Sequence, residues 1–117
     1  MRINEVVFTD ALPIDGYGPG FWRIGGKVIR NAVALGPNGL SDWGGYEDVD
    51  VLLAIGAKVD VLFIGTGAET AYLPKPLKEA LQSAGVAAEP MASAAAARTY
   101  NVLLSEGRRI GAALLTV

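Results

Sequence analysis

The most constraining feature of this chain is the uninterrupted apolar run Val61–Ile64, which leads directly into the glycine turn Gly65–Gly67. A strand without polar alternation is typical of a parallel sheet that is covered on both faces. Helical patterns precede and follow this run, and such alternation indicates right-handed crossovers around a parallel core. We therefore expect Val61–Ile64 to be the most buried strand, with Leu62 and Phe63 facing opposite sides of the sheet.

Three helices are expected around that strand. Residues 49, 52, 53 and 56 are spaced as one helical face, and Glu47 and Lys58 stand where they complement the helix dipole. A second helix should begin at prolines 74 and 76 and end at Gly85, with a short strand over residues 86–89 after it. Ser93 has the side chain of an N-cap for a third helix over residues 94–105, and residues 109–117 should form the closing strand.

The first half of the chain is expected to be rich in β-structure. Phe21–Ile24 and Lys27–Leu35 flank Gly25-Gly26, a pair typical of a tight hairpin turn. The remaining segments are a strand over Ile3–Phe8, a loop over Leu12–Gly20, and a turn over residues 36–39 with a loop through Gly45. The expected fold is one α/β domain, 1–117, in the order β, hairpin, α, β, α, β, α, β. The hairpin either extends the sheet or packs as a separate layer.

The composition limits the chemistry more than the fold. Of 117 residues, 51% are hydrophobic and 19% are charged, the net charge is −2, and there is neither His nor Cys. The missing Cys excludes disulfides and thiolate metal sites, and no acidic cluster has the spacing of a Ca²⁺ loop, so we expect no metal and no cofactor. Scattered basic residues argue against nucleic-acid binding. No targeting segment and no apolar run of the ~20 residues that span a bilayer is visible, so we expect a cytoplasmic protein without membrane insertion.

The turn Gly65–Gly67 has three candidate roles. In a dinucleotide-binding fingerprint a third glycine follows three residues after the second, but this position is Thr70, and the nearby Glu69 would repel phosphate. The two glycines can instead provide a sharp strand exit with positive φ. As a third role, the loop can contact a partner or a small polar ligand. The candidate binding residues of this segment are Gly65, Thr66, Gly67 and Glu69.

A polar stripe on the third helix is the second candidate site. Arg98, Asn101 and Ser105 recur at i, i+3 and i+7, as in a solvated helix face. Arg98 lies near the helix N-terminus, where backbone N–H groups are exposed. Its guanidinium can alternatively join these N–H groups in binding an anionic group in a bidentate manner. Arg98 and Gly65–Gly67 would then converge where loops gather at the C-terminal ends of parallel strands. The residues expected to face the core are Ala95, Thr99, Val102 and Leu103, together with Tyr100.

Aromatic residues are concentrated in the hairpin and its flanking loops. They are Tyr17, Phe21, Trp22, Trp43 and Tyr46. Such a group either packs a separate hairpin layer or forms a contact surface, since protein interfaces are enriched in aromatic side chains.

The motifs taken together resemble a known family of small domains. The resemblance is carried by Phe63–Gly67, Leu73-Pro74, Arg98–Leu103, Glu106–Arg109 and Ala112–Leu114, with Phe8–Asp10 and Gly16-Tyr17 before them. The family includes the mitochondrial complex I assembly factor 3 and many bacterial members without an assigned activity, and this chain looks like a bacterial member. The resemblance implies a three-layer fold with a mixed central sheet and an additional β layer. The matching positions include Gly65, Thr66, Gly67, Arg98, Thr99, Tyr100 and Asn101.

Two functional hypotheses remain. The first is a non-enzymatic protein-binding domain that assists the assembly of a membrane-associated respiratory complex, and it rests on the composition and on the resemblance. The alternative is a small-ligand-binding or enzymatic domain that uses Gly65–Gly67 and Arg98. No catalytic residue is assigned, because the serines have no histidine base.

Overall fold

The computed structural model describes residues 11–117, so the strand expected over Ile3–Phe8 and the Phe8–Asp10 part of the resemblance lie outside it. Within residues 11–117 the chain forms two sheets and three helices, which confirms the α/β class. The elements in chain order are β1 Ile14–Gly18, β2 Phe21–Ile24, β3 Lys27–Ile29, β4 Val33–Gly36, β5 Gly39–Asp42, α2 Val49–Gly56, β6 Val61–Gly65, α3 Lys75–Ser83, β7 Ala88–Met91, α4 Ser93–Ser105 and β8 Ile110–Leu114.

The central sheet is mixed, and its five strands lie in the order β5-β4-β8-β6-β7. β6 runs parallel to β7 and β8, whereas β4 runs antiparallel to β8 and β5. The expected parallel core is confirmed, although β7 covers Ala88–Met91 instead of residues 86–89. The expectation that Val61–Ile64 is the most buried strand is wrong. β8 lies in the middle of the sheet with all 5 of its residues buried, while Val61 is only half-buried.

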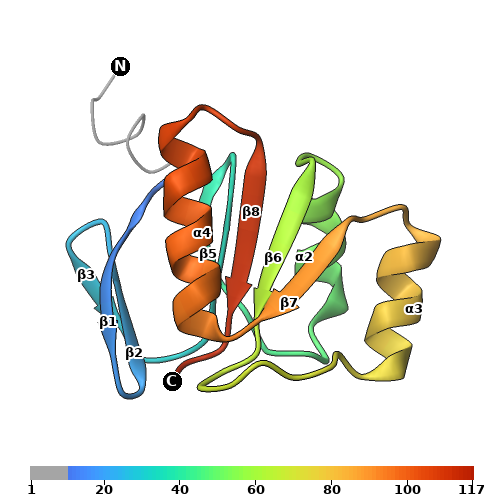
Figure 1. The fold of residues 1–117 in the computed structure, drawn as a ribbon, viewed down its shortest axis with the longest axis horizontal. Coiled ribbons are helices and arrows are strands. Elements are labelled where there is room, and N and C mark those ends of the chain that lie inside the picture. Colours follow the sequence, from blue (N-terminus) through green and yellow to red (C-terminus); the bar gives the residue numbers. More distant parts are fainter. Residues whose placement is uncertain (1–10) are drawn as a thin grey trace.

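Both faces of the central sheet are covered, which gives the three layers that the resemblance implies (Figure 1). α4 and the three-stranded sheet of β1, β2 and β3 pack on one face, and α2 and α3 pack on the other. Alternate residues of β6 serve the two cores as predicted, because Phe63 faces the first core and Leu62 faces the second. The first core includes Trp22, Ile24, Leu35, Tyr100 and Leu114, and the second includes Trp43, Leu52, Leu77 and Leu81.

The predicted hairpin is present, but its second strand is shorter than expected. Gly25 and Gly26 have φ values of +59° and +79°, as a primed turn requires, and β2 pairs antiparallel with β3 around them. The run Lys27–Leu35 does not remain in one strand. β3 ends at Ile29, and the chain then enters the central sheet as β4, where Val33–Gly36 is fully buried. Burial of these residues against β8 therefore outweighs continuation of the hairpin.

Two strands occur where loops were expected. β1 lies inside Leu12–Gly20 and pairs with β2, with an irregular register between Ile14 and Gly16. Gly18 has a packing role, since a Cβ on this residue would lie 2.7 Å from the Phe21 ring that covers it. β5 follows the predicted turn at residues 36–39 and pairs with β4. Both predictions of a loop were wrong because close packing and cross-strand pairing override the low strand propensity of glycine.

The third helix is present, but it turns a different face to the core. The residues of α4 that are buried are Ser93, Ala96, Ala97 and Tyr100. Tyr100 was expected in the core, whereas Val102 was expected there and is 51% exposed. The small side chains of Ala96 and Ala97 face the sheet, and α4 contacts β6 and β8. Ser93 is the first residue of the helix and not its cap, which is Ala92.

Candidate functional site

The turn that leaves β6 is bound to the start of α4 by two hydrogen bonds between Gly67 and Ser93. The Gly67 N–H donates to Ser93 Oγ at 2.8 Å, and the Ser93 N–H donates to the Gly67 carbonyl at 2.8 Å. A Cβ on Gly65 would lie 2.6 Å from Ser93 Oγ and 2.9 Å from Ser93 Cα. Gly65 is therefore required by the close approach of the helix, and only Gly67, with φ of +98°, has the positive φ expected of a strand exit.

Thr66 and Thr70 in this loop also form hydrogen bonds within the protein. The Thr66 N–H donates to the Met91 carbonyl at 2.8 Å, and its hydroxyl donates to the Glu69 carbonyl at 2.6 Å. The Ala92 N–H, at the N-cap of α4, donates to Thr70 Oγ1 at 3.2 Å. Backbone amides that a phosphate cradle would present to its ligand are thus already bonded, and the Glu69 side chain adds a negative charge nearby. The geometry fits a brace between β6, β7 and α4 better than a nucleotide loop.

Tyr100 and Asn101 attach α4 to the strand of the second sheet that lies beside it. The Tyr100 hydroxyl donates to the Leu12 carbonyl at 2.8 Å, and burial raises the pKa of this hydroxyl. Asn101 Oδ1 accepts from the Ile14 N–H and Asn101 Nδ2 donates to the Ile14 carbonyl, both at 2.8 Å. One amide side chain therefore satisfies both backbone groups of Ile14, as a neighbouring strand would. Within the block Arg98–Leu103, Tyr100 and Asn101 thus attach α4, which packs on the central sheet, to β1 and to the segment before it.

Arg98 and Thr99 take no part in the contact between α4 and β1, and their side chains point in different directions. The Thr99 hydroxyl lies 3.9 Å from Met91 Sδ, on the β7 side of α4. Arg98 is exposed, and it makes no hydrogen bond or ion pair with any residue from 11 to 117. At about 100° per residue, Arg98 lies roughly 140° around the helix from the buried Ser93 and about 7.5 Å further along its axis. Its convergence with Gly65–Gly67 on one ligand stays a prediction.

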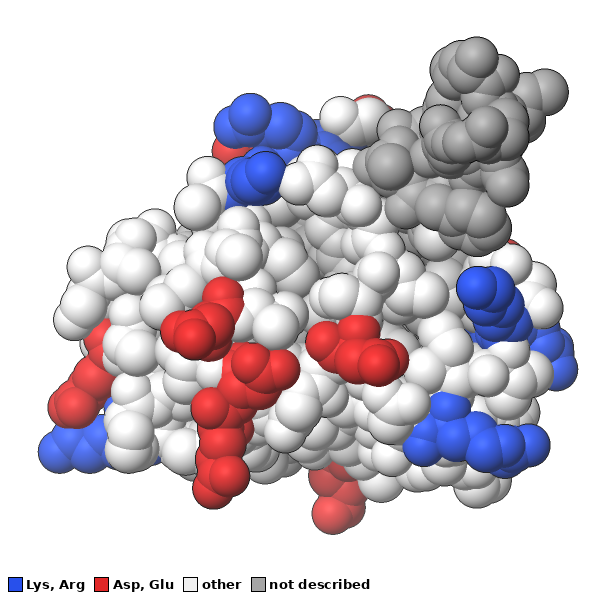
Figure 2. Space-filling model, turned by 180° about the vertical axis from the view of Figure 1, so that it is seen from behind, with Lys and Arg blue, Asp and Glu red and all other residues white. Residues whose placement is uncertain are grey.

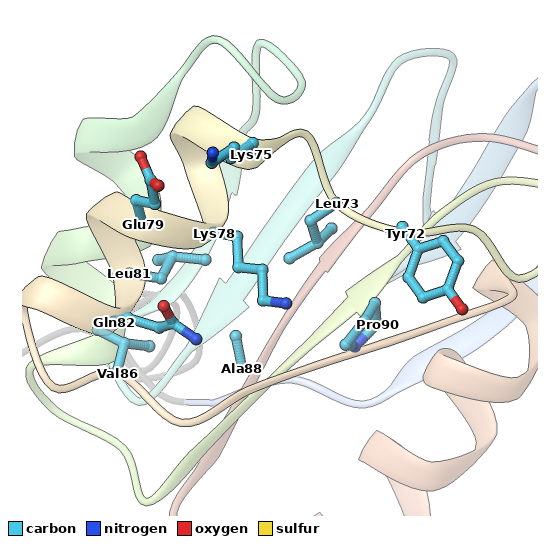
Figure 3. A pocket seen from close by; sticks show the side chains of 10 residues that line it. All are labelled: Tyr72, Leu73, Lys75, Lys78, Glu79, Leu81, Gln82, Val86, Ala88 and Pro90. Carbon is cyan, nitrogen blue, oxygen red and sulfur yellow. The ribbon is translucent and has the colours of Figure 1, made fainter.

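A groove between α3 and the edge strand β7 was not anticipated from the sequence (Figure 3). Its volume is about 540 Å³, within the range of protein ligand sites. Its lining residues are Tyr72, Leu73, Lys75, Lys78, Glu79, Leu81, Gln82, Val86, Ala88 and Pro90. The only sequence signal for it was the mixed polar face of the α3 segment, which has the spacing of an ordinary solvated helix.

Charge is unevenly distributed over the face formed by α2 and α3. Glu47, Asp48 and Asp50 stand at the start of α2. Seen from this side, acidic side chains gather in the middle of the face and basic ones lie toward its margins (Figure 2). Among residues 11–117, no three acidic side chains are close enough to hold a metal ion. No helix in this part of the chain has the length and apolar character needed to cross a membrane.

Comparison with known proteins identifies relatives along nearly the whole chain. The profile of a family described as protein of unknown function (DUF498/DUF598) matches residues 14–115. An uncharacterized protein of Rhodobacter capsulatus is 53% identical over 115 residues, which cover 98% of this chain and 93% of that protein. A crystal structure described as an outer membrane protein from Bartonella henselae is 34% identical with a TM-score of 0.83, and the match covers 94% of this chain and 99% of that one.

A more distant relative has a named role. The NADH dehydrogenase (ubiquinone) 1 alpha subcomplex assembly factor 3 of Rattus norvegicus is 29% identical over 115 residues, covering 92% of this chain. The match covers 62% of the rat protein, so this chain spans less than two thirds of that relative's length. The resemblance found in the sequence motifs is thereby confirmed.

Proposed function

The chain belongs to the family of proteins of unknown function DUF498/DUF598, and we propose that it is a non-enzymatic protein-binding domain that assists assembly of a membrane-associated respiratory complex. One observation carries the proposal, which is the similarity along 92% of the chain to a protein named as a complex I assembly factor. We place this activity in the cytoplasm, where the domain would bind a subunit before the complex is complete.

The surface that we assign to the partner is the outer side of α4. Arg98 and Val102 are both exposed there, one helical turn apart, and Val102 keeps 51% of its surface accessible. An arginine next to an aliphatic side chain is a common composition for an interface, because the guanidinium binds carboxylates while the apolar group excludes water. The polar groups of Thr66 and Asn101 are occupied inside the fold, which leaves Arg98 as the main contact among the predicted site residues.

The alternative is a small-ligand-binding or enzymatic domain that uses Gly65–Gly67 and Arg98. The observation in its favour is a guanidinium without an ion pair among residues 11–117. Against it stand the bonds that tie Gly67 to Ser93 and Thr66 to Met91, since a ligand at the loop would have to displace them. A thermal-shift screen against metabolites tests this alternative, which predicts a stabilising ligand that Arg98→Ala no longer binds.

The proposal is tested by co-purification from the native cell. A tagged chain should recover a respiratory-complex subunit, and Arg98→Glu should reduce that recovery by about tenfold, equivalent to about 1.4 kcal/mol of binding free energy. Arg23→Glu is the matched control, because Arg23 is an exposed arginine on β2, away from α4. Equal recovery with Arg98→Glu and with Arg23→Glu would remove Arg98 from the contact. Recovery of no such subunit by the unmodified chain would refute the proposed function.

A further inference from the structure

The groove between α3 and β7 has an apolar floor at the edge of the central sheet. β7 is the last strand in the order β5-β4-β8-β6-β7, and α3 lies beside it (Figure 1). Side chains of both elements line the groove between them (Figure 3). The floor is formed by Leu73, Leu81, Val86, Ala88 and Pro90. Burial of apolar surface here would contribute about 25 cal/mol for each Å² that a partner covers. The floor therefore supplies a driving force for binding but no selectivity by itself.

The polar side chains above that floor are hydrogen-bond donors. Lys78 extends from α3 over the groove toward β7, and the amide of Gln82 points the same way (Figure 3). The side chains of Lys75 and Lys78 make no ion pair or hydrogen bond with any residue from 11 to 117. Glu79, the one acidic residue that lines the groove, directs its carboxylate away from the floor (Figure 3). The groove thus has a positive rim, which selects for carboxylates on whatever covers it.

An aromatic side chain stands at the other end of the groove. Tyr72 is 97% exposed, the highest exposure among the large hydrophobic residues described. Its ring lies beyond Pro90, opposite the end that α3 forms (Figure 3). A fully exposed tyrosine beside an apolar groove is typical of a binding surface, since tyrosines are enriched among the residues that dominate binding energy.

The edge strand favours binding through side chains over binding through the backbone. The Leu62 N–H donates to the Ala87 carbonyl and the Thr66 N–H to the Met91 carbonyl, so the alternate residues Ala88 and Pro90 direct their backbone outward. Pro90 has no N–H, so an added strand would find only the amide of Ala88. A partner strand cannot form a continuous ladder there. A helix, whose backbone groups are bonded internally, can occupy the groove with its side chains alone.

We propose that the groove between α3 and β7 docks an amphipathic helix of a partner protein, with leucine-like residues on its apolar face and acidic residues beside them. The apolar face covers Leu73, Val86 and Ala88, while Lys75 and Lys78 bind the flanking carboxylates. This surface is separate from the outer side of α4, and the inference holds whether or not the domain assists complex assembly.

The experiment uses three labelled peptides of about 18 residues, a length at which a helix can form. All three carry the same leucine stripe, and the flanking positions are Glu in the first, Lys in the second and Gln in the third. Fluorescence anisotropy should show the Glu peptide binding at least about tenfold more tightly than the Lys peptide, with the Gln peptide between them. In ¹H–¹⁵N spectra, the amides of Leu73, Lys78, Val86 and Ala88 should shift with the Glu peptide.

Charge reversal in the groove provides the second measurement. Lys78→Glu should lower the affinity for the Glu peptide by about tenfold and raise the affinity for the Lys peptide. Lys58→Glu is the matched control, because Lys58 is exposed after α2, outside the groove, and carries the same change of charge. It should alter either affinity by less than about threefold, as expected of a distant and screened charge.

Several results would overturn the proposal. Equal binding of the Glu and Lys peptides would remove the role of the lysines, and shifts confined to α4 would place the peptide elsewhere. If sodium octanoate saturated the shifts of the same amide signals at a lower concentration than the Glu peptide requires, the groove would be a site for small carboxylates and not for a helix. Binding of none of the peptides would refute helix docking at this site.

Discussion

Asn101→Ala tests whether Asn101 has a structural role in attaching α4 to β1. Asn101 bonds both backbone groups of Ile14 at 2.8 Å, and Ile14 is only 6% exposed. Each bond contributes about 1 kcal/mol net, and each backbone group left without a partner costs about 1–3 kcal/mol when it stays buried. The contact is only partly buried, so entering water would offset some of this loss. We therefore expect Asn101→Ala to lower the free energy of unfolding by about 3 kcal/mol.

The assay is urea unfolding followed by the fluorescence of Trp22 and Trp43, which lie in the two cores. With a slope of about 1–3 kcal/mol per molar urea, the midpoint should fall by about 1–3 M. Arg98→Ala is the control on the same helix, and we expect a change within about 0.5 kcal/mol because Arg98 is exposed and bonds no residue from 11 to 117. A cost below about 1 kcal/mol for Asn101→Ala would refute this reasoning and return the side chain to the candidate binding residues.

Three further predictions concern the core, the glycine turn and the buried tyrosine. Phe63→Ala should cost about 3–5 kcal/mol in urea unfolding, since Phe63 is 2% exposed within the first core, and a cost under about 1 kcal/mol would contradict its position. Gly65→Ala should lower the melting temperature because its Cβ would meet Ser93 Cα at 2.9 Å, and an unchanged value would show that α4 can move freely. Burial raises the pKa of Tyr100, so its neutral form stabilises the fold below about pH 10 and this contribution is lost as the pH rises further. The stability difference between the unmodified chain and Tyr100→Phe should shrink above about pH 10, and a difference that does not change with pH would contradict this assignment.

The sequence predicted the parts of the fold that depend on strong periodicity. Val61–Ile64 is uniformly apolar, and the structure places it parallel to its neighbours with alternate side chains in two cores. Gly25-Gly26 has the turn chemistry of a hairpin, and both residues have positive φ. Local patterns of this kind are informative because each one suits a single backbone geometry.

Other features could not be predicted, because they depend on what the chain meets in three dimensions. β1 contains Gly16 and Gly18, which argue locally against a strand, yet β1 is held by β2 and by the Asn101 side chain. The orientation of α4 was misjudged because Val102 is more hydrophobic than Ala96, while the close approach to the sheet requires the smaller residue.

The binding role of the candidate site residues stays a prediction, although the structure shows which of them already bond inside the fold. The motif residues do make specific contacts. Gly65 allows α4 to pack closely and Asn101 attaches α4 to β1, and residue type alone does not reveal either role. Arg98 is exposed, as its place in a polar stripe indicated. The groove between α3 and β7 could not be predicted, because it is formed by segments that only the topology brings together and the polar face of α3 has the spacing of an ordinary solvated helix.

The proposed binding of a protein during respiratory-complex assembly is best tested by native gel electrophoresis of membranes from a strain that lacks the chain. We predict that assembled complex I decreases and a smaller intermediate accumulates, that the unmodified chain restores the complex, and that the tagged chain migrates with the intermediate. A normal amount of complex I in the deletion strain, with the tagged chain migrating alone, would show that the chain has no role in assembling the complex.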